Sequence, residues 1–482
     1  MGSGVSNMLR GRRAMALKSQ SLTEGPLVRR ILAFSTPLVL SNLLQVLFNM
    51  SDIAVVGRFA GAQALGAVGS TVILVGLFTG FLMGMGSGVN VLVARYIGAE
   101  SRADVEETVH TSLLISLAAG LILFAVGAGF SRLMLRLLNT KAELIDGAAL
   151  YMRIYFLGMP AAAIYNFGNA VFSAAGNTRR PLFYLMIAGA LNVAMNLFFV
   201  IFCRMGVAGV ALASALSQYL CAGLILAALL RSRESYALHI RSLRVTPEKA
   251  RFVLALGVPS GAQNAVFSLA NLFIQRGVNS FDAIVVEGNA AAANADALVY
   301  DVMAAFYTAC ASFTSQNLGA GRKERILRIY AISLAYSFGA GALLGLSLAA
   351  FGDSFLSLFT ADAAVAAAGM TRLRVMGLSY AFSAFMDCTI AASRGLGKSF
   401  APMVIVFLGS CAFRVLWVYT VFAWFGTILS LYLLYIFSWA ITAAAEIWYF
   451  VRAYKREMAL LEPVLNGVSV SVDAERKCQP FS

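Results

Sequence analysis

The sequence predicts an all-α integral membrane protein with twelve transmembrane helices arranged as two parallel six-helix repeats. Three observations support this fold class: an apolar composition, apolar runs long enough to cross a bilayer, and an internal repeat. Of the 482 residues, 60% are hydrophobic and 12% are charged, with a mean hydropathy of +0.79, whereas soluble domains have about 25% charged residues. The bilayer is therefore the solvent in which this chain folds.

Apolar runs of about 18 or more residues recur between short polar segments, and each is long enough for a transmembrane helix. The expected helices span residues 30–57, 64–96, 107–130, 145–175, 181–203, 207–230, 250–279, 287–317, 326–351, 364–393, 400–424 and 428–452. Pro37, Pro160 and Pro259 fall inside the first, fourth and seventh helices, where a missing amide N–H allows a kink. Pro37 is the predicted hinge.

Lysine and arginine gather in alternate loops and at both ends of the chain, which accounts for the net charge of +14. The positive-inside rule places such segments in the cytoplasm, so both termini are expected there. No basic domain is large enough to bind nucleic acid. The predicted organisation is a cytoplasmic N-terminal arm without a cleaved signal peptide (1–29), an N-lobe (30–230), a cytoplasmic loop between the lobes (231–249), a C-lobe (250–455) and a cytoplasmic tail (456–482).

The second half of the chain repeats the first at an offset near 222 residues. The matched pairs include Arg29 with Arg251, Pro37 with Pro259, Asn42 with Asn264, Asn49 with Asn271 and, at an offset of 221, Gly98 with Gly319 and Pro181 with Pro402. Each copy contains six spans, so both copies enter the membrane from the same side and form parallel repeats. Two such bundles with a site between them are what alternating access requires.

One stretch of the first helix sets polar side chains among lipid-soluble ones. Asn42, Gln45, Asn49 and Asp52 recur at steps of three, four and three residues, so they share one face of the helix. A carboxylate inside a membrane is costly to bury and indicates a functional site, whereas the three amides fit either a pathway or hydrogen bonds between helices. Asp52 aligns with Ile274 in the second repeat, so we expect the coupling ion to bind in the N-lobe.

Five cysteines lie in apolar spans and the sixth lies in the C-terminal tail, without the spacing of a disulfide framework or a metal site. His110 and His239 are assigned no chemical role. The chain contains no HExxH, GxSxG or GxxxxGK[ST] motif, so the sequence does not indicate an enzyme. We therefore expect no metal and no cofactor, and transport driven by an ion gradient with H⁺ or Na⁺ as the coupling ion.

Several segments together resemble the multidrug and toxic compound extrusion (MATE) family, over about residues 25–457. They are PLVLSNLLQVLFNMSDIAVVG followed by LGAVG, then ARYIGA, AAGNTRRP, LNVAMNLFFVI, GVAGVALAS and TSQNLGAGR. The resemblance implies two six-helix lobes in a V shape, and export of amphipathic, often cationic, compounds against an inward flow of H⁺ or Na⁺. It also implies a cation site in the N-lobe at Asp52, Asn192, Asn196 and Ser214.

The chain departs from the family pattern at two places. Members often carry Asp where this chain has Asn196, which leaves Asp52 as the only carboxylate of the group. Some branches carry a Glu on the seventh helix, where this chain reads NAVFSLAN, so it is more similar to the DinF-like branch. A sodium ion needs several oxygens, which Asp52, two amides and a hydroxyl supply, whereas a proton needs only the acid.

Further polar residues are candidates for a substrate cavity between the lobes. They are Asn42, Gln45, Asn49, Tyr165, Asn166, Asn169, Asn264, Asn271, Gln275, Asp296, Asp301 and Asp387. For Asp387, a place in the cavity and a buried ion pair agree equally well with the sequence. We expect Glu446 to extend to water at the membrane surface and Arg414 to have an acidic partner.

The expected function is multidrug efflux by antiport in the cytoplasmic (inner) membrane of a bacterium, by a monomer whose partners are amphipathic cations and the lipid bilayer. One alternative is a lipid-linked saccharide flippase of the same superfamily, whose cavity has to be strongly cationic to hold a pyrophosphate. A second alternative is a membrane receptor or sensor without transport, against which the duplicated six-helix unit argues.

Overall fold

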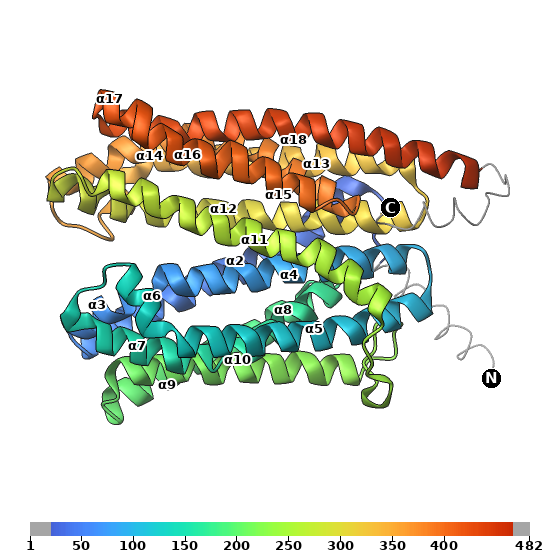
Figure 1. Ribbon diagram of the computed structural model, residues 1–482, viewed down its shortest axis with the longest axis horizontal. Helices are drawn as coiled ribbons and strands as arrows, with labels where there is room; N and C mark the ends of the chain where they lie inside the picture. Colours follow the sequence, from blue (N-terminus) through green and yellow to red (C-terminus); the bar gives the residue numbers. More distant parts are fainter. Residues whose placement is uncertain (1–20, 466–482) are drawn as a thin grey trace, which may run out of the picture.

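The computed structural model describes residues 21–465, and its regular elements in that range are helices (Figure 1). The first half contains α2 (Leu27–Phe59), α3 (Ala62–Gly69), α4 (Val72–Gly98), α5 (Arg102–Gly129), α6 (Ser131–Leu137), α7 (Ala142–Phe156), α8 (Met159–Ala174), α9 (Arg179–Leu197), η1 (Phe198–Phe202) and α10 (Gly206–Leu230). The second half contains η2 (Ile240–Ser242), α11 (Pro247–Val278), α12 (Ala283–Gly319), α13 (Lys323–Leu356), α14 (Ala363–Gly395), α15 (Phe400–Val406), η3 (Phe407–Ala412), α16 (Phe413–Trp417), η4 (Val418–Phe422), α17 (Ala423–Phe425) and α18 (Ile428–Leu465).

Ten continuous helices are long and apolar enough to cross a membrane, and two bent pairs qualify when each pair is one span. With both pairs counted, the described residues form twelve spans, which confirms the predicted fold class. The fourth span is α7 with α8, and the tenth is α14, which bends between residues 377 and 379; both bends measure 47°. Pro160 lies in the first turn of α8, after the bend, where its missing N–H leaves no helical hydrogen bond unmade.

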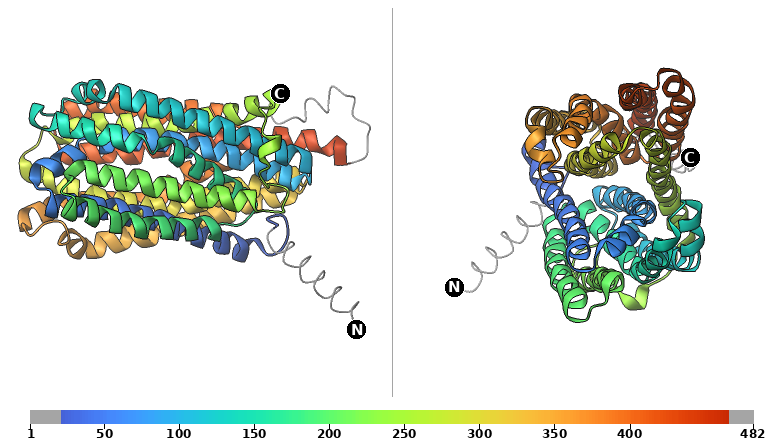
Figure 2. Two further views of the ribbon diagram at one scale, coloured as in Figure 1. Left: turned by 90° about the horizontal axis from the view of Figure 1, so that it is seen from below. Right: turned by 90° about the vertical axis from the view of Figure 1, so that its left-hand side faces the viewer.

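The spans form two bundles that lie on opposite sides of the long axis, and we call them the N-lobe (α2–α10) and the C-lobe (α11–α18) (Figures 1 and 2). The start of α2 and the end of α18 lie at the same end of the molecule, as an even number of spans requires (Figures 1 and 2). We call this end the termini end.

The lobes share apolar cores at the termini end and have separate cores at the other end. Ile31 and Phe34 of α2 pack into a cluster with Phe313 of α12, and the two phenyl rings meet edge to face at 5.4 Å. Toward the opposite end, Val56 belongs to a cluster of N-lobe residues and Ile274 to a cluster of C-lobe residues. The interface between the lobes is therefore concentrated at one end.

Glycines bring the backbones of the two lobes into contact at this interface. A Cβ atom on Gly84 would collide with the backbone of Gly261, and one on Gly88 would collide with Gly257, so α4 and α11 meet through two glycines four residues apart on each helix. This small-xxx-small spacing is typical of closely packed membrane helices.

Polar side chains complete the contact between the lobes. Lys249, buried at the start of α11, donates to the Asp104 carboxylate at 2.6 Å and to the Tyr96 hydroxyl at 3.0 Å. The Ser312 hydroxyl of α12 donates to Asn90 Oδ1 of α4 at 2.8 Å. These contacts have to break if the lobes separate at the termini end.

The helix α2 continues without a break through Pro37. The Ser41 hydroxyl donates to the Pro37 carbonyl at 2.9 Å, one turn away on the same helix. Leu38 and Asn42 still contact the C-lobe beyond Pro37, so Pro37 lies within the segment of α2 at the lobe interface, and its role as a hinge stays a prediction.

Candidate functional site

Packing of α2 against α9 fixes the position of Asp52. Gly189 of α9 lies so close to the ring of Phe48 that a Cβ atom there would collide with it. Phe48 lies one turn before Asp52, and Asn192 and Asn196 follow Gly189 by three and seven residues on the same face of α9. This close approach of the two helices therefore brings the acid and both amides together.

The four residues predicted as a cation site are linked by hydrogen bonds. The Ser214 hydroxyl of α10 donates to Asp52 Oδ2 at 2.9 Å, and Asn196 Nδ2 donates to Asp52 Oδ1. Asn196 Nδ2 also donates to Asn192 Oδ1 at 3.2 Å, and Asn192 Nδ2 donates to Ser214 Oγ at 3.5 Å. Asp52 is 9% exposed and the other three are at most 5% exposed.

One oxygen of this site has no partner. Asn196 Oδ1 is buried and accepts no hydrogen bond from any described residue, which is unfavourable for an amide oxygen. The site offers this oxygen, both carboxylate oxygens of Asp52, the amide oxygen of Asn192 and the hydroxyl of Ser214. Hard cations prefer oxygen ligands, and a protonated Asp52 is itself a donor, so the site is chemically suited to a cation or a proton.

An apolar cluster and two tyrosines surround the acid. Val56 and Val200 belong to a buried cluster that includes Tyr151. The rings of Tyr151 and Tyr155 stack at 5.7 Å, and both hydroxyls interact electrostatically with Asp52. Just beyond Asn196, the fifth span changes from α-helix to the π-helix η1, an irregularity that is frequent at functional sites. Sequence reasoning missed both tyrosines and this irregularity.

Two amides that match in the repeat link the lobes. Asn42 Nδ2 of α2 donates to the backbone carbonyl of Asp301 on α12 at 2.8 Å. Asn264 Nδ2 of α11 donates to the backbone carbonyl of Gly80 on α4 at 3.0 Å. Each amide therefore bonds a backbone carbonyl of the opposite lobe.

Asp296 belongs to a polar network inside the C-lobe. It pairs with Arg372 of α14, and the Tyr380 hydroxyl donates to its other oxygen. Arg372 Nη1 donates to Asn289 Oδ1 at 2.6 Å, and the Tyr432 hydroxyl donates to the same oxygen at 3.3 Å. Arg372 is 4% exposed and the Asp296 side chain is 19% exposed, so this is a largely buried ion pair whose partners all come from one lobe.

Glu446 does not extend to water, so the prediction for this residue is wrong. It is 0% exposed, and neither carboxylate oxygen has a hydrogen-bond partner among residues 21–465. It interacts electrostatically with Arg394 and Asp387 of α14. The predicted span ended at residue 452, whereas α18 continues to Leu465, which places Glu446 well inside the helix.

Arg414 lacks the expected acidic partner, since no carboxylate in the described part of the chain lies within 4.0 Å of its nitrogens. Its Nε donates to Ser438 Oγ at 3.2 Å, and its Nη1 donates to Asn271 Oδ1 at 3.4 Å. The guanidinium carbon lies 4.8 Å from the centre of the Tyr435 ring. A hydroxyl, an amide and an aromatic ring hold this cation, and Asp387 acts on it only at longer range.

The other cavity candidates differ in exposure. Gln45, Tyr165, Asn166, Asn169, Gln275, Asp301 and Asp387 are half-buried, and Asn49 and Asn271 are exposed. Their contact with a substrate stays a prediction.

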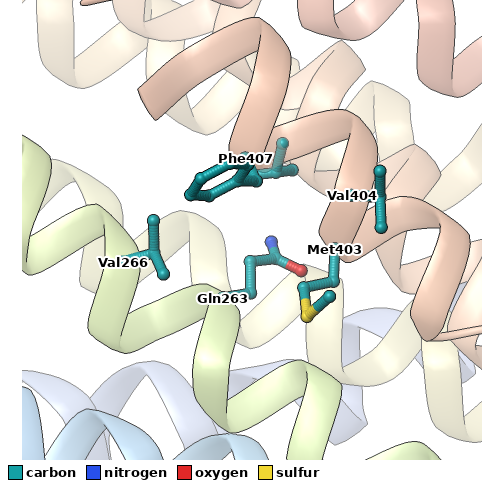
Figure 3. Close-up of a pocket in the computed structure, with 6 residues that line it drawn as sticks. Gln263, Val266, Met403, Val404 and Phe407 are labelled. Atoms are coloured by element: carbon teal, nitrogen blue, oxygen red, sulfur yellow. The ribbon is translucent and has the colours of Figure 1, made fainter. Parts of the chain in front are cut away.

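A small apolar pocket of about 150 Å³ lies between α11 and α15 of the C-lobe (Figure 3). It is lined by Gln263, Val266, Met403, Val404, Val406 and Phe407. Gln263 Oε1 accepts a hydrogen bond from Arg394 at 2.7 Å, so its oxygen is already satisfied. The pocket is below the ~300–1,000 Å³ of typical ligand sites, and we assign it no substrate.

The MatE family model matches this chain twice, over residues 37–198 and 259–420. The two matches begin 222 residues apart, which is the offset of the sequence repeat, and together they cover more than half of the chain. The chain belongs to the MATE family. It is accordingly a multi-pass membrane transporter of the multidrug efflux type and not an enzyme.

Relatives and solved structures extend the likeness over most of this MATE-family chain. A probable multidrug resistance protein of Bacillus subtilis, YpnP, is 27% identical over 85% of this chain and 92% of its own length. A FAD transporter of Shewanella oneidensis is 25% identical over 71% of this chain and 76% of its own length. A solved structure described as the outward-facing conformation of a multidrug resistance MATE family transporter has a TM-score of 0.83 at 21% identity, over 92% of this chain and 98% of that chain.

Proposed function

We propose that this MATE-family protein is a secondary-active exporter of amphipathic, often cationic, compounds that works in exchange for H⁺ or Na⁺, with Asp52 as the coupling residue. The observation that carries the proposal is the Asp52 site, where neutral donors alone hold a buried carboxylate beside an amide oxygen without a partner. The multidrug resistance protein among the relatives supports the substrate class.

The position of the lobe contacts suggests which side of the membrane is open in this conformation. The positive-inside rule assigns the termini end to the cytoplasm. The lobes are in contact at that end, so we infer that this conformation is open to the outside. In this conformation an exported compound leaves and the coupling ion enters.

Arrival of the ion changes the hydrogen bonds of Asp52. A protonated carboxyl becomes a donor, and the Asn196 amide can turn its free oxygen toward it; a sodium ion is held by the same oxygens. Either event alters the packing of α2 on α9 and α10, because these three helices supply the site. A difference in ion affinity between the two conformations then shifts the equilibrium toward the inward-open one.

Flux measurements test this mechanism. Vesicles containing the protein are loaded with a fluorescent cationic dye, and release is followed under an imposed proton gradient or an imposed sodium gradient. We expect release under one gradient only, abolished by Asp52→Asn and preserved by Asp146→Asn, whose carboxylate forms an exposed ion pair with Arg132. A second arm replaces the dye with FAD, since one relative is a FAD transporter.

The outcomes separate the parts of the proposal. If a gradient moves FAD but not the dye, the proposed cationic substrate class is wrong, whereas the proposed coupling role of Asp52 is retained. Equal flux in wild type and Asp52→Asn removes Asp52 from the mechanism. If neither gradient moves the dye or FAD, antiport of these two solutes is overturned. Flipping of a fluorescent lipid is then measured in the same vesicles.

A further inference from the structure

The segment that joins the lobes is fixed to the N-lobe at several points. We call residues 231–246 the linker. Tyr236 and Leu238 are buried in an apolar cluster that also contains Phe172 of α8. Arg244 donates to the Glu107 carboxylate of α5 at 2.8 Å, and the Thr246 N–H donates to the Thr111 hydroxyl at 3.0 Å. The linker is therefore a docked element.

Both histidines of the chain meet at this docking surface. The full sequence contains two histidines, 129 residues apart, one on α5 and one in the linker. Their rings lie 6.1 Å apart between centres, and His239 Nδ1 lies 3.4 Å from Glu106 Oε1. Glu106 and His110 are four residues apart on α5, so their side chains share one face of the helix.

We propose that Glu106, His110 and His239 form a binding site for a divalent transition metal that fastens the linker to α5. One ligand atom from each of the three side chains lies within 4.8 Å of the other two. Ligand atoms around a tetrahedral zinc ion are about 3.4 Å apart, because the zinc-to-ligand distances are about 2.1 Å. Small side-chain rotations close the remaining gap. Two imidazoles and one carboxylate are ligands that suit Zn²⁺, Co²⁺ and Ni²⁺.

Two of the three proposed ligands are accessible from solution, and the third is buried. The side chains of His239 and Glu106 are 59% and 43% exposed, so both can move onto an ion from solution. His110 is 2% exposed and is held in place by the helix.

A metal ion bound by His110 Nε2 has to replace the hydrogen bond that this nitrogen accepts in the structure. His110 Nε2 accepts the backbone N–H of His239 at 3.0 Å, so this nitrogen carries the lone pair that a metal needs. Coordination exchanges this neutral hydrogen bond for a metal–nitrogen bond and moves the linker backbone slightly at His239. Without metal, the same nitrogen anchors the linker directly.

Metal binding to the purified full-length protein tests the site. The protein carries an affinity tag without histidine, and binding is followed by calorimetry with Zn²⁺ and by the visible absorption of Co²⁺. We expect one equivalent to bind. Loss of an outer-shell partner weakens metal sites about 10–100-fold, so Glu106→Gln and His239→Gln should weaken binding at least about tenfold. Glu234→Gln is the matched control, because it removes an exposed carboxylate of the linker itself and leaves the three ligands and the Arg244–Glu107 contact intact.

Proteolysis supplies a second readout. Trypsin cuts after Arg241 and Arg244 in the linker, and Zn²⁺ should slow these cuts in wild type and in Glu234→Gln but not in His239→Gln. Absence of saturable Zn²⁺ and Co²⁺ binding, or unchanged affinity in both ligand variants, overturns the proposal. The cluster is then a hydrogen-bonded anchor of the linker only. Neither readout depends on transport, so the result is independent of the proposed antiport.

Discussion

The two lobes share one scaffold but differ in the chemistry at equivalent positions. At offsets of 221–222 residues, the polar site of the N-lobe corresponds to an aliphatic and aromatic cluster of the C-lobe: Asp52 aligns with Ile274, Asn196 with Trp417 and Ser214 with Tyr435. Both copies of the fourth span of the repeat bend by 47°, although only the N-lobe copy has a proline there. The two lobes therefore share their helix geometry, whereas the residues predicted to bind the ion are present in one lobe only.

Each lobe also buries one acidic residue, in contrasting surroundings. Among the described residues, Asp52 and Glu446 are the acids with at most 9% exposure. Asp52 receives hydrogen bonds from two neutral groups, whereas Glu446 receives none and lies near Arg394. A carboxylate held by neutral donors can exchange them for a cation, whereas Glu446 has no such donors to exchange and already lies in the field of Arg394. This contrast favours the N-lobe as the place where the ion binds.

Removing charge compensation from the C-lobe is the strongest test of this contrast. Arg372→Ala leaves the Asp296 carboxylate, whose side chain is 19% exposed, without a cation; breaking a fully buried pair costs about 3–5 kcal/mol, which is the upper bound of the loss expected here. Asp52→Asn leaves no charge unpaired, so we expect it to lower the free energy of unfolding by less than about 1.5 kcal/mol. Denaturant titrations in detergent compare the two variants.

A double variant controls for loss of packing around Arg372. Arg372→Met combined with Asp296→Leu removes both charges and should recover most of the stability, because a buried pair contributes little beyond apolar side chains of similar size. Equal losses for Arg372→Ala and Asp52→Asn contradict the proposed difference between the lobes.

The repeat was readable from the sequence, but the contacts that it forms were not. Gly98 and Gly319 were matched as repeat partners, and so were Asn42 and Asn264. In the structure each of these residues contacts the opposite lobe, which a match between two segments cannot show by itself. The twelve spans were predicted because bilayer thickness dictates the length of an apolar run, a constraint that acts on each helix separately.

The candidate site shows the same limit. The polar face and its burial cost singled out Asp52, whereas Asn192, Asn196 and Ser214 came from the family resemblance. Tyr151 and Tyr155 were missed because two aromatic residues four apart on an apolar helix are also ordinary packing.

The errors at Glu446 and Arg414 have a related cause. Both were judged by their position along a helix, whereas their partners depend on which face of the helix turns toward α14 or α11. That rotation is set by packing with helices far away in the sequence, so no local pattern reports it.

The symmetric part of the lobe interface yields a smaller expected effect. A Cβ atom on Gly98 would collide with the carbonyl of Gln316, and one on Gly319 would collide with the carbonyl of Arg95. Gly98→Ala and Gly319→Ala should each destabilise the lobe contact by about 1–3 kcal/mol, which is about 5–150-fold in the opening equilibrium. Because the two contacts are equivalent in the repeat, we expect similar values from the two variants.

Separation of the lobes at the termini end can be measured as the rate at which a cysteine buried between them reacts with a soluble label. Ser312→Cys, in a background without the native cysteines, places a thiol between α12 and α4, and a water-soluble maleimide reacts with it when the lobes separate. Gly223→Ala is the control, because no atom lies within 4 Å of its added Cβ. Labelling that responds to Gly98→Ala but not to Gly319→Ala shows that the lobes are not equivalent even at their shared interface.

Two regions of the termini end are related by the repeat but differ in their charged residues, and we call them the two flanks: one surrounds Lys249 and Asp104, and the other surrounds Leu27 and Arg325. On one flank, Lys249 forms an ion pair with Asp104 across the lobes. The repeat counterparts of these two residues are Leu27 and Arg325, so the buried lysine pair is not repeated on the second flank, where Arg322 lies 4.0 Å from the Glu24 carboxylate and the two side chains are 42% and 43% exposed. There, Arg325 donates to the Gly25 carbonyl at 3.1 Å.

Lys249→Met should therefore weaken one flank of the closed end and leave the other unchanged. The side chain of Asp104 is 37% exposed, so solvent screens the pair and we expect a loss of about 1 kcal/mol, or about fivefold faster labelling of Ser312→Cys. Arg325→Met should have a smaller effect, since the exposed Gly25 carbonyl can bond to water instead. In the Asp104→Asn background, Lys249→Met should add little, because its charged partner is already gone. If the two changes add fully, the ion pair does not hold the lobes together, and the apolar, glycine and remaining hydrogen-bond contacts account for the closed end.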